Sequence, residues 1–536
     1  MKNFIEISFI KNKYPKLFRI ILFLPGLASI TIISVTAGGY FFYLQWYYND
    51  IILTIWLLII AYYLRWIIRW LEYISFILYA LFKIKKFEKI NFEKILKWEY
   101  TNLEEKKLIK KMKENQENLN AYEIVHRCLI PTYKESESIL QDTLSNLVKS
   151  NFDKNKIAVT ICWEEADKEN FLKIIQNLEK KFKNKFWFFN YTIHPKWIPW
   201  EIPWKWANIK YAAKQTYQKI LKHFNTTPEK VLVTTLDADT NVDKEYFNIL
   251  TYTYLSTPNK KYKSYQPLIF FFNNFWDAPF FSKAVSLGNS YWILFNTTKN
   301  KWLRNFSTHA QPLDALIELD FWSNETIVED WHQYRRSYFG FYWNHECVPV
   351  YTKVYQDANL NKNILLTAKA QYNQMRRWAH WAEDISYSVC QRIYNFKQLN
   401  FRRTLYEVLR LTEGHIMWAS LHFVLSIWFW LTLIKDIKFF SQNSLGKVLS
   451  IFLGISLIFL LLTTILNILL SPWYKLSKKE KIIEFLKFIT LYPIFIWPIL
   501  VIFSGLPALH TQIMLMLGKP MKKFNVTIKV RKNESI

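Results

Sequence analysis

The chain has 536 residues, of which 51% are hydrophobic and 18% aromatic. This length exceeds one ordinary soluble core, because domains usually hold about 100–200 residues. The high apolar fraction excludes an intrinsically disordered chain, and four scattered cysteines exclude a small disulfide scaffold. The 70 Lys and Arg residues outnumber the 43 Asp and Glu residues, for a net charge of +27. One count is unusual: 10 residues are glycine and 24 are tryptophan, although glycine ordinarily makes up about 7% of a protein.

Four long stretches without a charged residue point to a membrane protein. No Asp, Glu, Lys or Arg occurs in residues 20–49, 415–434, 448–470 and 488–518. A helix that crosses a bilayer needs about 20 apolar residues, so each stretch is long enough. A further span is expected from residue 51 past residue 64, and the prolines of the last stretch predict a broken hairpin that returns to the same side.

Basic residues beside these stretches predict the orientation. Lys and Arg gather before the first span, after the second and in the loop 471–481, and loops rich in these residues stay on the cytoplasmic side. We therefore expect a multi-pass protein of the plasma (inner) membrane with residues 83–410 in the cytoplasm. Basic loops that face anionic lipids explain the net charge, so the lipid bilayer is an expected partner and nucleic acid is not.

Composition divides the chain into six parts. In chain order we expect a transmembrane hairpin of two helices, a solvated linker helix, a cytoplasmic catalytic domain, an interfacial helix, a membrane block of three or four helices and a basic cytoplasmic tail. These parts correspond to residues 1–82, 83–122, 123–396, 397–414, 415–518 and 519–536. The candidate chemistry therefore lies between residues 123 and 396.

The catalytic part begins with a strand, a helix and a second strand. Residues 124–130 form an apolar run that ends at Pro131, residues 135–149 carry apolar side chains at helical spacing, and residues 157–162 are β-branched and apolar. This order is typical of a βαβ unit, and it predicts an α/β fold with a mostly parallel sheet.

A further expected strand, residues 231–236, is followed by Asp237-Ala238-Asp239. Ligands of parallel sheets bind outside the carboxyl ends of the strands. Two carboxylates at such an end suit a hard divalent cation that is also held by the phosphates of a substrate. Taken alone, this tripeptide is better interpreted as a solvated turn, so the decision rests on the motifs that accompany it.

Four motifs occur in an order and at a spacing that resemble one enzyme family. They are Pro131-Thr132-Tyr133-Lys134-Glu135, Asp237-Ala238-Asp239, Val328-Glu329-Asp330-Trp331 and Gln374-Met375-Arg376-Arg377-Trp378. Over residues 123–387 the chain resembles the membrane-integrated family 2 glycosyltransferases, the inverting class that includes cellulose and hyaluronan synthases. The resemblance implies a Rossmann-like GT-A fold, a nucleotide sugar donor, a glycan or lipid-linked acceptor and a divalent metal, Mg²⁺ or Mn²⁺.

The same resemblance implies a role for each motif. Asp330 is the expected general base, Glu329, Trp331 and Trp378 are expected to bind the acceptor, and Asp237 and Asp239 are the expected metal ligands. The expected donor-binding residues are Pro131, Thr132, Tyr133, Glu135, Glu164, Glu165, Lys205, Asn208, Asp237, Gln374 and Arg377.

Elementary chemistry supports these roles without the family. Inverting transfer needs one carboxylate that takes the proton of the acceptor hydroxyl while the diphosphate leaves from the opposite face of the sugar. The forked donors of Arg377 suit diphosphate oxygens, and the flat ring of Trp378 suits a sugar. Two plainer interpretations stay open: a charge cluster at a helix start for Glu329 and Asp330, and an amphipathic helix at the membrane surface for residues 374–378.

The chain departs from the family pattern at several positions. Lys134 stands where Asn is usual, and Val328 stands where Thr is usual. After the second strand, relatives have an Asp that contacts the nucleotide base, whereas this chain has Glu164 and Glu165 nearby. The identity of the donor nucleotide therefore stays open.

Tryptophan also stands where glycine is expected. Lys205 and Asn208 fit a Gly-Lys-x-x-Asn arrangement, but Trp204 occupies its glycine position, Trp381 replaces a frequent glycine after the last motif, and Trp200 lies in a turn between prolines. Glycine suits such positions because the backbone adopts a positive φ or approaches a ligand closely. We therefore hypothesise that some of the 24 tryptophans are glycines, since certain bacteria read the codon UGA as glycine.

The sequence thus predicts an inverting glycosyltransferase that moves a sugar from a nucleotide diphosphate sugar to a growing polysaccharide or another glycan at the membrane. Two alternatives stay open: nonprocessive transfer to a lipid carrier, and an inactive relative that serves as a membrane scaffold or binds glycans. The intact Asp237, Asp239, Asp330 and Arg377 favour an active enzyme, whereas a genuine tryptophan at position 204 favours the inactive relative.

Overall fold

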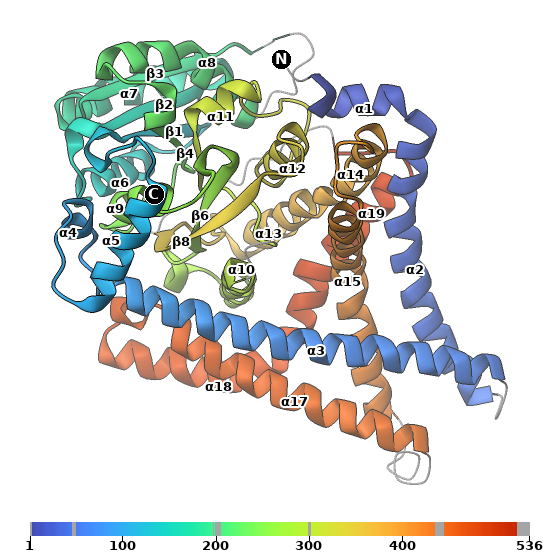
Figure 1. Cartoon of the computed structure of the whole chain (residues 1–536). Coiled ribbons are helices and arrows are strands. Elements are labelled where there is room, and N and C mark those ends of the chain that lie inside the picture. Colours follow the sequence, from blue (N-terminus) through green and yellow to red (C-terminus); the bar gives the residue numbers. More distant parts are fainter. Residues whose placement is uncertain are drawn as a thin grey trace.

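The computed structural model describes residues 3–45, 50–196, 198, 205–298, 302–434 and 444–521 (Figure 1). An α/β domain built on one sheet lies beside a set of long helices. The chain enters this domain at the end of α3 (Asp50–Phe87) and leaves it at the start of α15 (Phe401–Ile434).

Within the described residues, eight strands form one mixed sheet in the order β3-β2-β1-β4-β7-β6-β8-β5. They are β1 (Val125–Thr132), β2 (Ile157–Glu164), β3 (Phe188–His194), β4 (Val231–Thr235), β5 (Asn241–Val242), β6 (Lys263–Phe270), β7 (His309–Pro312) and β8 (Glu346–Tyr355). The neighbours β3, β2, β1 and β4 are all parallel. Because β7 runs antiparallel to β4 and to β6, the second half of the sheet is mixed rather than parallel.

The predicted βαβ unit is confirmed. α6 (Glu137–Val148) connects β1 to β2, and the register pairs Thr132 with Trp163 near the ends of the two strands. Beyond β4, the Leu236 N–H donates to the Leu129 carbonyl oxygen at 2.9 Å, which keeps the chain beside β1 up to Asp237. The ends of β1, β2 and β4 therefore lie at one edge of the sheet.

Helices cover both faces of the parallel half. Cys128 and Ile130 of β1 pack with one buried cluster, and Val125 and Leu129 pack with another, because successive side chains of a strand point to opposite faces. The helices on the first face are α6, α7 (Lys168–Phe182) and α9 (Tyr246–Leu255), and those on the second are α8 (Lys205–Phe224) and α11 (Leu313–Glu318). This layering is typical of an α/β domain.

Four helices connect the sheet region to the long helices (Figure 1). They are α10 (Phe280–Thr298), α12 (Glu329–Gly340), α13 (Ile364–Ala379) and α14 (Glu383–Tyr394). α10 packs between β6 and the long helices α3 and α18 (Lys478–Leu500), and α13 packs against α19 (Leu506–Met516). These contacts bring the domain and the long helices around a shared space.

Two helices of the described residues are long and apolar enough to cross a membrane, Pro15–Gly38 within α2 (Pro15–Gln45) and Lys478–Met516. Gly454–Leu470, within α17 (Ser444–Leu470), is a shorter apolar helix. α2 packs against α15 and α19, and α17 packs against α18. α3 and α15, which were also expected to span, are joined by an ion pair between Arg69 and Glu413 at 3.0 Å.

Residues 83–122 are not the solvated linker helix expected from the sequence. α3 continues to Phe87, and α4 (Phe92–Leu96) and α5 (Leu103–Asn115) follow. Ile95 and Met112 are fully buried in the core of the α/β domain. Each of these two short helices buries one narrow face. Because the helices are brief and rich in lysine, their apolar residues show no clear helical periodicity in the sequence.

Two expectations about the C-terminal helices are also wrong. No boundary separates an interfacial helix at 397–414 from the following span, because α15 runs unbroken from Phe401 to Ile434. The expected broken hairpin is instead a continuous helical path in which a π-helical turn (Val501–Gly505) joins α18 to α19. Prolines and π turns bend helices, and here they do so without a loop.

The N-terminal residues pack on the α/β domain rather than forming only part of a hairpin. Tyr387 of α14 donates its hydroxyl to the Ile5 carbonyl oxygen at 2.7 Å. Lys11 of α1 (Ile7–Lys13) forms an ion pair with Glu383 at 2.6 Å. The segment before α2 therefore fixes α14 against α12.

Candidate functional site

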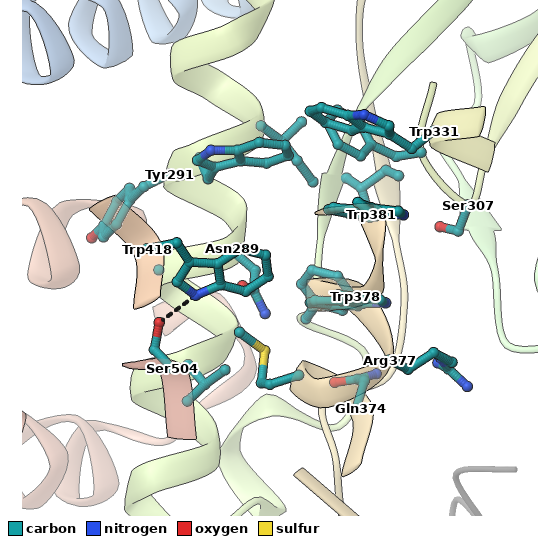
Figure 2. A pocket seen from close by; sticks show the side chains of 18 of the residues that line it. Asn289, Tyr291, Ser307, Trp331, Gln374, Arg377, Trp378, Trp381, Trp418 and Ser504 are labelled. Atoms are coloured by element: carbon teal, nitrogen blue, oxygen red, sulfur yellow. Dashed lines mark hydrogen bonds between the residues drawn. The ribbon is translucent and has the colours of Figure 1, made fainter. Parts of the chain in front are cut away.

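A cavity of about 1310 Å³ extends from the carboxyl ends of β1, β2 and β4 to the long helices α3, α15, α17 and α18. α10, α12 and α13 line its middle, part of which is drawn in Figure 2. The predicted site residues that line it are Pro131, Thr132, Tyr133, Glu135, Glu164, Lys205, Asn208, Asp237, Asp239, Asp330, Trp331, Gln374, Arg377 and Trp378. The fold thus brings motifs far apart in the sequence into one space.

Glu135 holds together the turn that follows β1. Its carboxylate accepts hydrogen bonds from the Thr132 hydroxyl, at 2.8 Å, and from the Tyr133 N–H. Lys134 has a φ of 64°, in the left-handed region that Asn adopts more easily than Lys, and its N–H donates to Asp167 at 2.8 Å. Glu135 therefore shapes the loop at the donor end of the cavity.

The two glutamates after the second strand have different surroundings. Glu164 lines the cavity, and its carboxylate lies 3.1 Å from Nδ1 of the buried His194. Glu165 accepts a hydrogen bond from the Lys196 N–H at 2.9 Å and lies outside the cavity lining. Of the two candidates, Glu164 is therefore the one that lines the cavity.

The first turn of α8 supplies two residues to the donor end. Lys205 forms an ion pair with Asp237, and the buried Asn208 amide donates to the Cys162 carbonyl oxygen at 2.8 Å. A helix N-terminus favours anions, so this turn adds to the positive charge of Lys205. Trp200 and Trp204, which precede α8, lie outside the described residues.

The two aspartates after β4 each contact the end of β8. Asp237, besides its ion pair with Lys205, accepts a hydrogen bond from the Gln356 amide at 3.2 Å. Asp239 is buried and accepts a hydrogen bond from the Asp357 N–H at 2.9 Å. No motif indicated Gln356 or Asp357, because their part in the site depends on the position of β8 in the sheet.

The side chains around these two aspartates limit the kind of metal site that they can form. The part of the chain that the structure describes holds no group of three or more His, Cys, Asp or Glu side chains arranged to bind a metal ion. Mg²⁺ often takes one or two carboxylates and completes its shell with substrate phosphates and water. Asp237 and Asp239 therefore fit Mg²⁺ or Mn²⁺ bound together with a diphosphate, and they do not fit a metal held by protein side chains alone.

Asp330 lies in the first turn of α12 and lines the cavity. Its Oδ1 accepts a hydrogen bond from the Trp331 N–H at 2.8 Å. Burial raises the pKa of the Asp330 carboxyl to about 6, against the opposing effects of that N–H and of the charges on Lys205 and Arg377. This carboxyl is ionised at neutral pH and is a stronger base than an exposed aspartate. The side chain of Glu329 is outside the described part of the structure.

Tryptophan rings, here called the aromatic wall, line the middle of the cavity (Figure 2). Trp331 and Trp381 stack with ring centroids 4.8 Å apart, and Trp381 and Trp378 are nearly parallel at 6.4 Å. Trp292 of α10 stacks on Trp331 at 5.5 Å. Four helical elements, α10, α12, α13 and the 3₁₀ helix His380–Ala382, thus bring these rings into one stack.

The motif on α13 contributes an amide and a cation. The Gln374 side-chain oxygen accepts a hydrogen bond from the Asn359 amide at 2.8 Å, which fixes it at the cavity wall. Arg377, one turn later, lines the same cavity, and its charge acts to lower the pKa of Asp330. The interpretation as a membrane-surface helix does not describe these side chains, since they face the cavity.

Several cavity residues were not indicated by any motif. They include Trp292, Arg304, Ser307, Arg335, Gln356 and Glu407. His332 follows Asp330 by two residues but is not part of the cavity lining, and it is fully buried with Nδ1 2.6 Å from Asp384. Position next to a motif is therefore a poor guide to a place in the site.

Two tryptophans have the backbone conformation that favours glycine. Trp98, just after α4, has a φ of 67°, and Trp343, just after α12, has a φ of 68°. Beside Trp98, the Glu99 N–H donates to the Lys94 carbonyl oxygen at 2.9 Å, a bond of the motif in which glycine usually ends a helix. Trp381 lies in a 3₁₀ helix (His380–Ala382) without a positive φ, so the backbone reason offered for glycine does not apply there.

No protein-family model matches the chain, and a search of curated proteins finds no match. Solved structures similar to it include the mannosyltransferase PcManGT from Pyrobaculum calidifontis in complex with GDP-Man and Mn²⁺. It is 10% identical over 81% of this chain and 98% of that chain, with a TM-score of 0.39. GalNAc-T7 with UDP, GalNAc and Mn²⁺ is 13% identical over 56% of this chain and 58% of that chain, with a TM-score of 0.33. TarS residues 1–349 from S. aureus, in complex with UDP-GlcNAc, is 14% identical over 57% of this chain and 88% of that chain, with a TM-score of 0.30. The structural neighbours are thus glycosyltransferases of low similarity.

Proposed function

We propose that this chain is an inverting glycosyltransferase of the membrane-integrated family 2 type, with a GT-A catalytic domain. It transfers a sugar from a nucleoside diphosphate sugar to a hydroxyl of a glycan acceptor. The observation that carries the proposal is that Asp330, a half-buried carboxylate with a raised pKa, lines the same cavity as Asp237 and Asp239 at the strand ends.

The donor binds at the strand ends. Lys205 and Arg377 line this part of the cavity and pair with the diphosphate oxygens, Arg377 through two parallel donors. Glu164 faces the nucleoside, at the end of β2. A Mg²⁺ or Mn²⁺ ion held by Asp237 and Asp239 supplies, when bound, positive charge that neutralises the leaving diphosphate.

Asp330 activates the acceptor. Its carboxylate takes the proton of the acceptor hydroxyl, whose oxygen forms a bond to the anomeric carbon while the bond from that carbon to the diphosphate breaks. Attack from the face opposite to the leaving group inverts the anomeric centre. The Trp331 N–H bound to Oδ1 fixes the carboxylate, and the second oxygen is the one that receives the proton.

The acceptor lies on the aromatic wall, and the cavity beyond it supports extension of a glycan. Trp331 and Trp378 line this part of the cavity, where their indole rings contact the sugar of the acceptor. The cavity continues between α15, α17 and α18, so a product that grows at Asp330 has space in the direction of the long helices. Together with the apolar helices at Pro15–Gly38 and Lys478–Met516, this supports a multi-pass membrane enzyme with a cytoplasmic active site.

The proposal is tested by Asp330→Asn in the full chain reconstituted in lipid. A panel of radiolabelled nucleotide sugars first identifies the donor, and sizing of the product separates polymer growth from a single transfer. We expect Asp330→Asn to lower transfer by about 10²–10⁴-fold, the usual worth of a general base, with nucleoside diphosphate affinity retained. The exposed Asp153→Asn is the matched control and keeps full activity. Transfer at the parental rate in Asp330→Asn contradicts the assigned base.

A further inference from the structure

The loop that leads to Asp330 has two unusual backbone positions. Residues 319–328, here called the base loop, connect α11 to α12. Asp320 and Phe321 have φ values of 57° and 63°, in the left-handed region that costs such residues free energy. This conformation persists only where the surrounding structure holds it. The contacts of the base loop therefore determine how the chain enters α12.

One arginine of α12 anchors the start of the base loop. Arg336 is fully buried and donates to the carbonyl oxygens of Phe321, at 2.6 Å, and Leu319, at 3.1 Å. It also donates to the side-chain oxygen of Gln333, one turn earlier on α12, at 3.0 Å. A single guanidinium thus joins the loop to the helix that carries Asp330.

The charge of this arginine is balanced by the N-terminal segment, residues 3–13. Within the described residues, the carboxylate that forms an ion pair with Arg336 is that of Glu6, directly before α1. The second oxygen of Glu6 accepts a hydrogen bond from the Ser323 hydroxyl at 3.4 Å. Burial raises the pKa of Glu6, but the charges of Arg336 and Lys210 outweigh it and keep this pKa below its ordinary value. Without Glu6, the buried guanidinium would keep an uncompensated charge.

The same segment also holds the second half of the base loop. Glu325 accepts hydrogen bonds from the Ser8 N–H at 2.8 Å and from the Ser8 hydroxyl at 2.6 Å. Ile5 and Ile7 are buried in the same apolar cluster as Ile327. Two carboxylates, one on the N-terminal segment and one on the base loop, therefore connect the two.

These contacts act on Asp330 through the backbone. Val328 precedes α12, and its side chain forms no capping hydrogen bond, so a cap does not fix the first turn of the helix. Asp330 lies in that turn, directly after the base loop. Glu6 and Ser8 are not part of the cavity lining, so they do not touch substrate. Because a misplacement of about 1 Å lowers a rate by as much as about 10²-fold, contacts that hold the loop affect catalysis.

We propose that Glu6 and Ser8 are positioning residues for Asp330, which hold the base loop so that the carboxylate of Asp330 faces the acceptor. The proposal rests on the sugar transfer proposed above, in which Asp330 is the base. The N-terminal segment continues into α2, which contains a candidate membrane span. The place of the base is therefore tied to the seating of that helix.

The first test compares kcat with donor binding in the full chain reconstituted in lipid. Glu6→Gln keeps the shape of the side chain and removes its charge. We expect kcat to fall about 10–100-fold, while the donor KM and the nucleoside diphosphate affinity change less than about twofold. Glu93→Gln is the matched control, because Glu93 of α4 forms an exposed ion pair with Lys97, and it keeps the parental kcat.

A second pair of variants keeps the test decisive if Glu6→Gln does not fold. Ser8 is exposed, so Ser8→Asp is tolerated, and it places a second negative charge beside Glu325. Because like charges repel, kcat is expected to fall about threefold. Ser8→Asp combined with Glu325→Gln removes the repulsion and is expected to recover the parental kcat. A loss caused by misfolding is not repaired in this way.

Hydrogen–deuterium exchange, measured without donor, localises the effect of Glu6→Gln. The backbone amides of residues 319–332 are expected to exchange at least about tenfold faster than in the parent, because the loop opens locally. Those of α6, which packs elsewhere in the α/β domain, are expected to be unchanged.

Three results overturn the proposal. They are a parental kcat in a folded Glu6→Gln or in Ser8→Asp, a nucleoside diphosphate affinity that falls as much as kcat, and no recovery when Glu325→Gln is added to Ser8→Asp. Faster exchange throughout the α/β domain also overturns it, since Glu6 then has only a structural role. Failure of the proposed function is recognised separately, as the absence of transfer by the parental chain from every nucleotide sugar.

Discussion

The two ends of the cavity are built from different kinds of structure. At the donor end, short segments after β1, β2 and β4 supply many of the side chains, and Lys205 forms an ion pair with Asp237. At the far end, Glu407 of α15 is shared by Arg304 and by Arg335 of α12. The ion pair at the donor end can exchange its partners for a metal and a diphosphate, whereas the shared carboxylate joins elements that are distant in the sequence. The donor end is thus built mainly by loops, and the far end by the packing of helices.

The largest expected effect tests the donor end. Removal of divalent metal by EDTA is expected to abolish transfer, and Mg²⁺ or Mn²⁺ to restore it. Asp239→Asn is expected to lower metal-dependent donor affinity by about 10–100-fold, since even partners of a metal ligand contribute that much. The measurement is donor binding with and without metal.

The exposed Asp153→Asn is the matched control for that experiment, and its metal-dependent donor affinity is expected to be unchanged. Donor affinity that is equal with and without Mg²⁺ or Mn²⁺ contradicts the metal assignment and the division of the cavity into two ends.

The pH dependence of transfer tests the role of Asp330 as the general base. Because the base must be unprotonated and the pKa of Asp330 is raised to about 6, kcat/KM is expected to rise through pH 6 and to level off above it. Below pH 6 the rate falls about tenfold per pH unit. An ordinary aspartate, with a pKa near 3.8, would leave the profile flat down to about pH 5.

A stability measurement shows whether the raised pKa has the assigned cause. A carboxyl whose pKa is higher in the folded than in the unfolded state stabilises the fold when protonated, and this contribution is lost as pH rises from about 4 to about 6. Asp330→Asn is therefore expected to be at least as stable as the parent at pH 8. A clear loss of stability there assigns Asp330 a structural role.

The donor end was largely predictable from the sequence because its signals are local. A β-branched run followed by Asp237-Ala238-Asp239 predicts, within ten residues, both the strand and the two carboxylates at its end. The parallel order of β1, β2 and β4 then brings Thr132, Glu164 and Asp237 together without further information. What the local pattern did not give was the contribution of Gln356 and Asp357, which depends on where β8 joins the sheet.

The far end was not predictable, because it too depends on contacts between elements that are distant in the sequence. Arg304, Arg335 and Glu407 meet only when α12 and α15 pack, and no spacing in the sequence relates them. Charge-free stretches correctly indicated long apolar helices, but the pairing of Arg69 with Glu413 between α3 and α15 requires the tertiary structure. The prediction of a solvated linker helix at 83–122 was wrong because α4 and α5 bury only a few side chains each, which leaves little signal in the sequence.

A smaller effect is expected for the tryptophans of the aromatic wall, which lies between the two ends of the cavity. Substitutions of Trp378 and of Trp381 are expected to change the acceptor KM differently. Trp378→Ala is expected to raise the acceptor KM by about tenfold, since stacking on an aromatic ring is worth about 1–2 kcal/mol. Trp381→Gly removes the ring between Trp331 and Trp378 and is expected to leave the acceptor KM unchanged or lower it, because the space between two flat faces opens. Kinetics with varied acceptor at saturating donor measures both. A Trp381→Gly variant that loses acceptor binding as Trp378→Ala does assigns Trp381 to the sugar-binding surface.

The smallest expected effect concerns Trp98 and Trp343, which lie at neither end of the cavity. Substitutions at these positions distinguish the cost of backbone strain from the loss of side-chain packing. Each has a positive φ, which costs an L-residue about 1–2 kcal/mol and glycine almost nothing. Replacement by Ala and by Gly removes the same indole contacts, so the difference between the two variants reports the backbone alone. We expect Gly to be about 1 kcal/mol more stable than Ala at both positions.

Trp187 is the matched control for that comparison. It is 56% exposed and has no positive φ, so Gly at this position is expected to be no more stable than Ala. The thermal unfolding midpoint of the six variants in detergent gives the answer. A preference for Gly at 98 and 343 together with UGA codons at these positions in the gene means that the natural chain carries glycine there, and the excess of tryptophan then has a cause in decoding. Equal stability of the Gly and Ala variants, or UGG codons at both positions, contradicts the hypothesis.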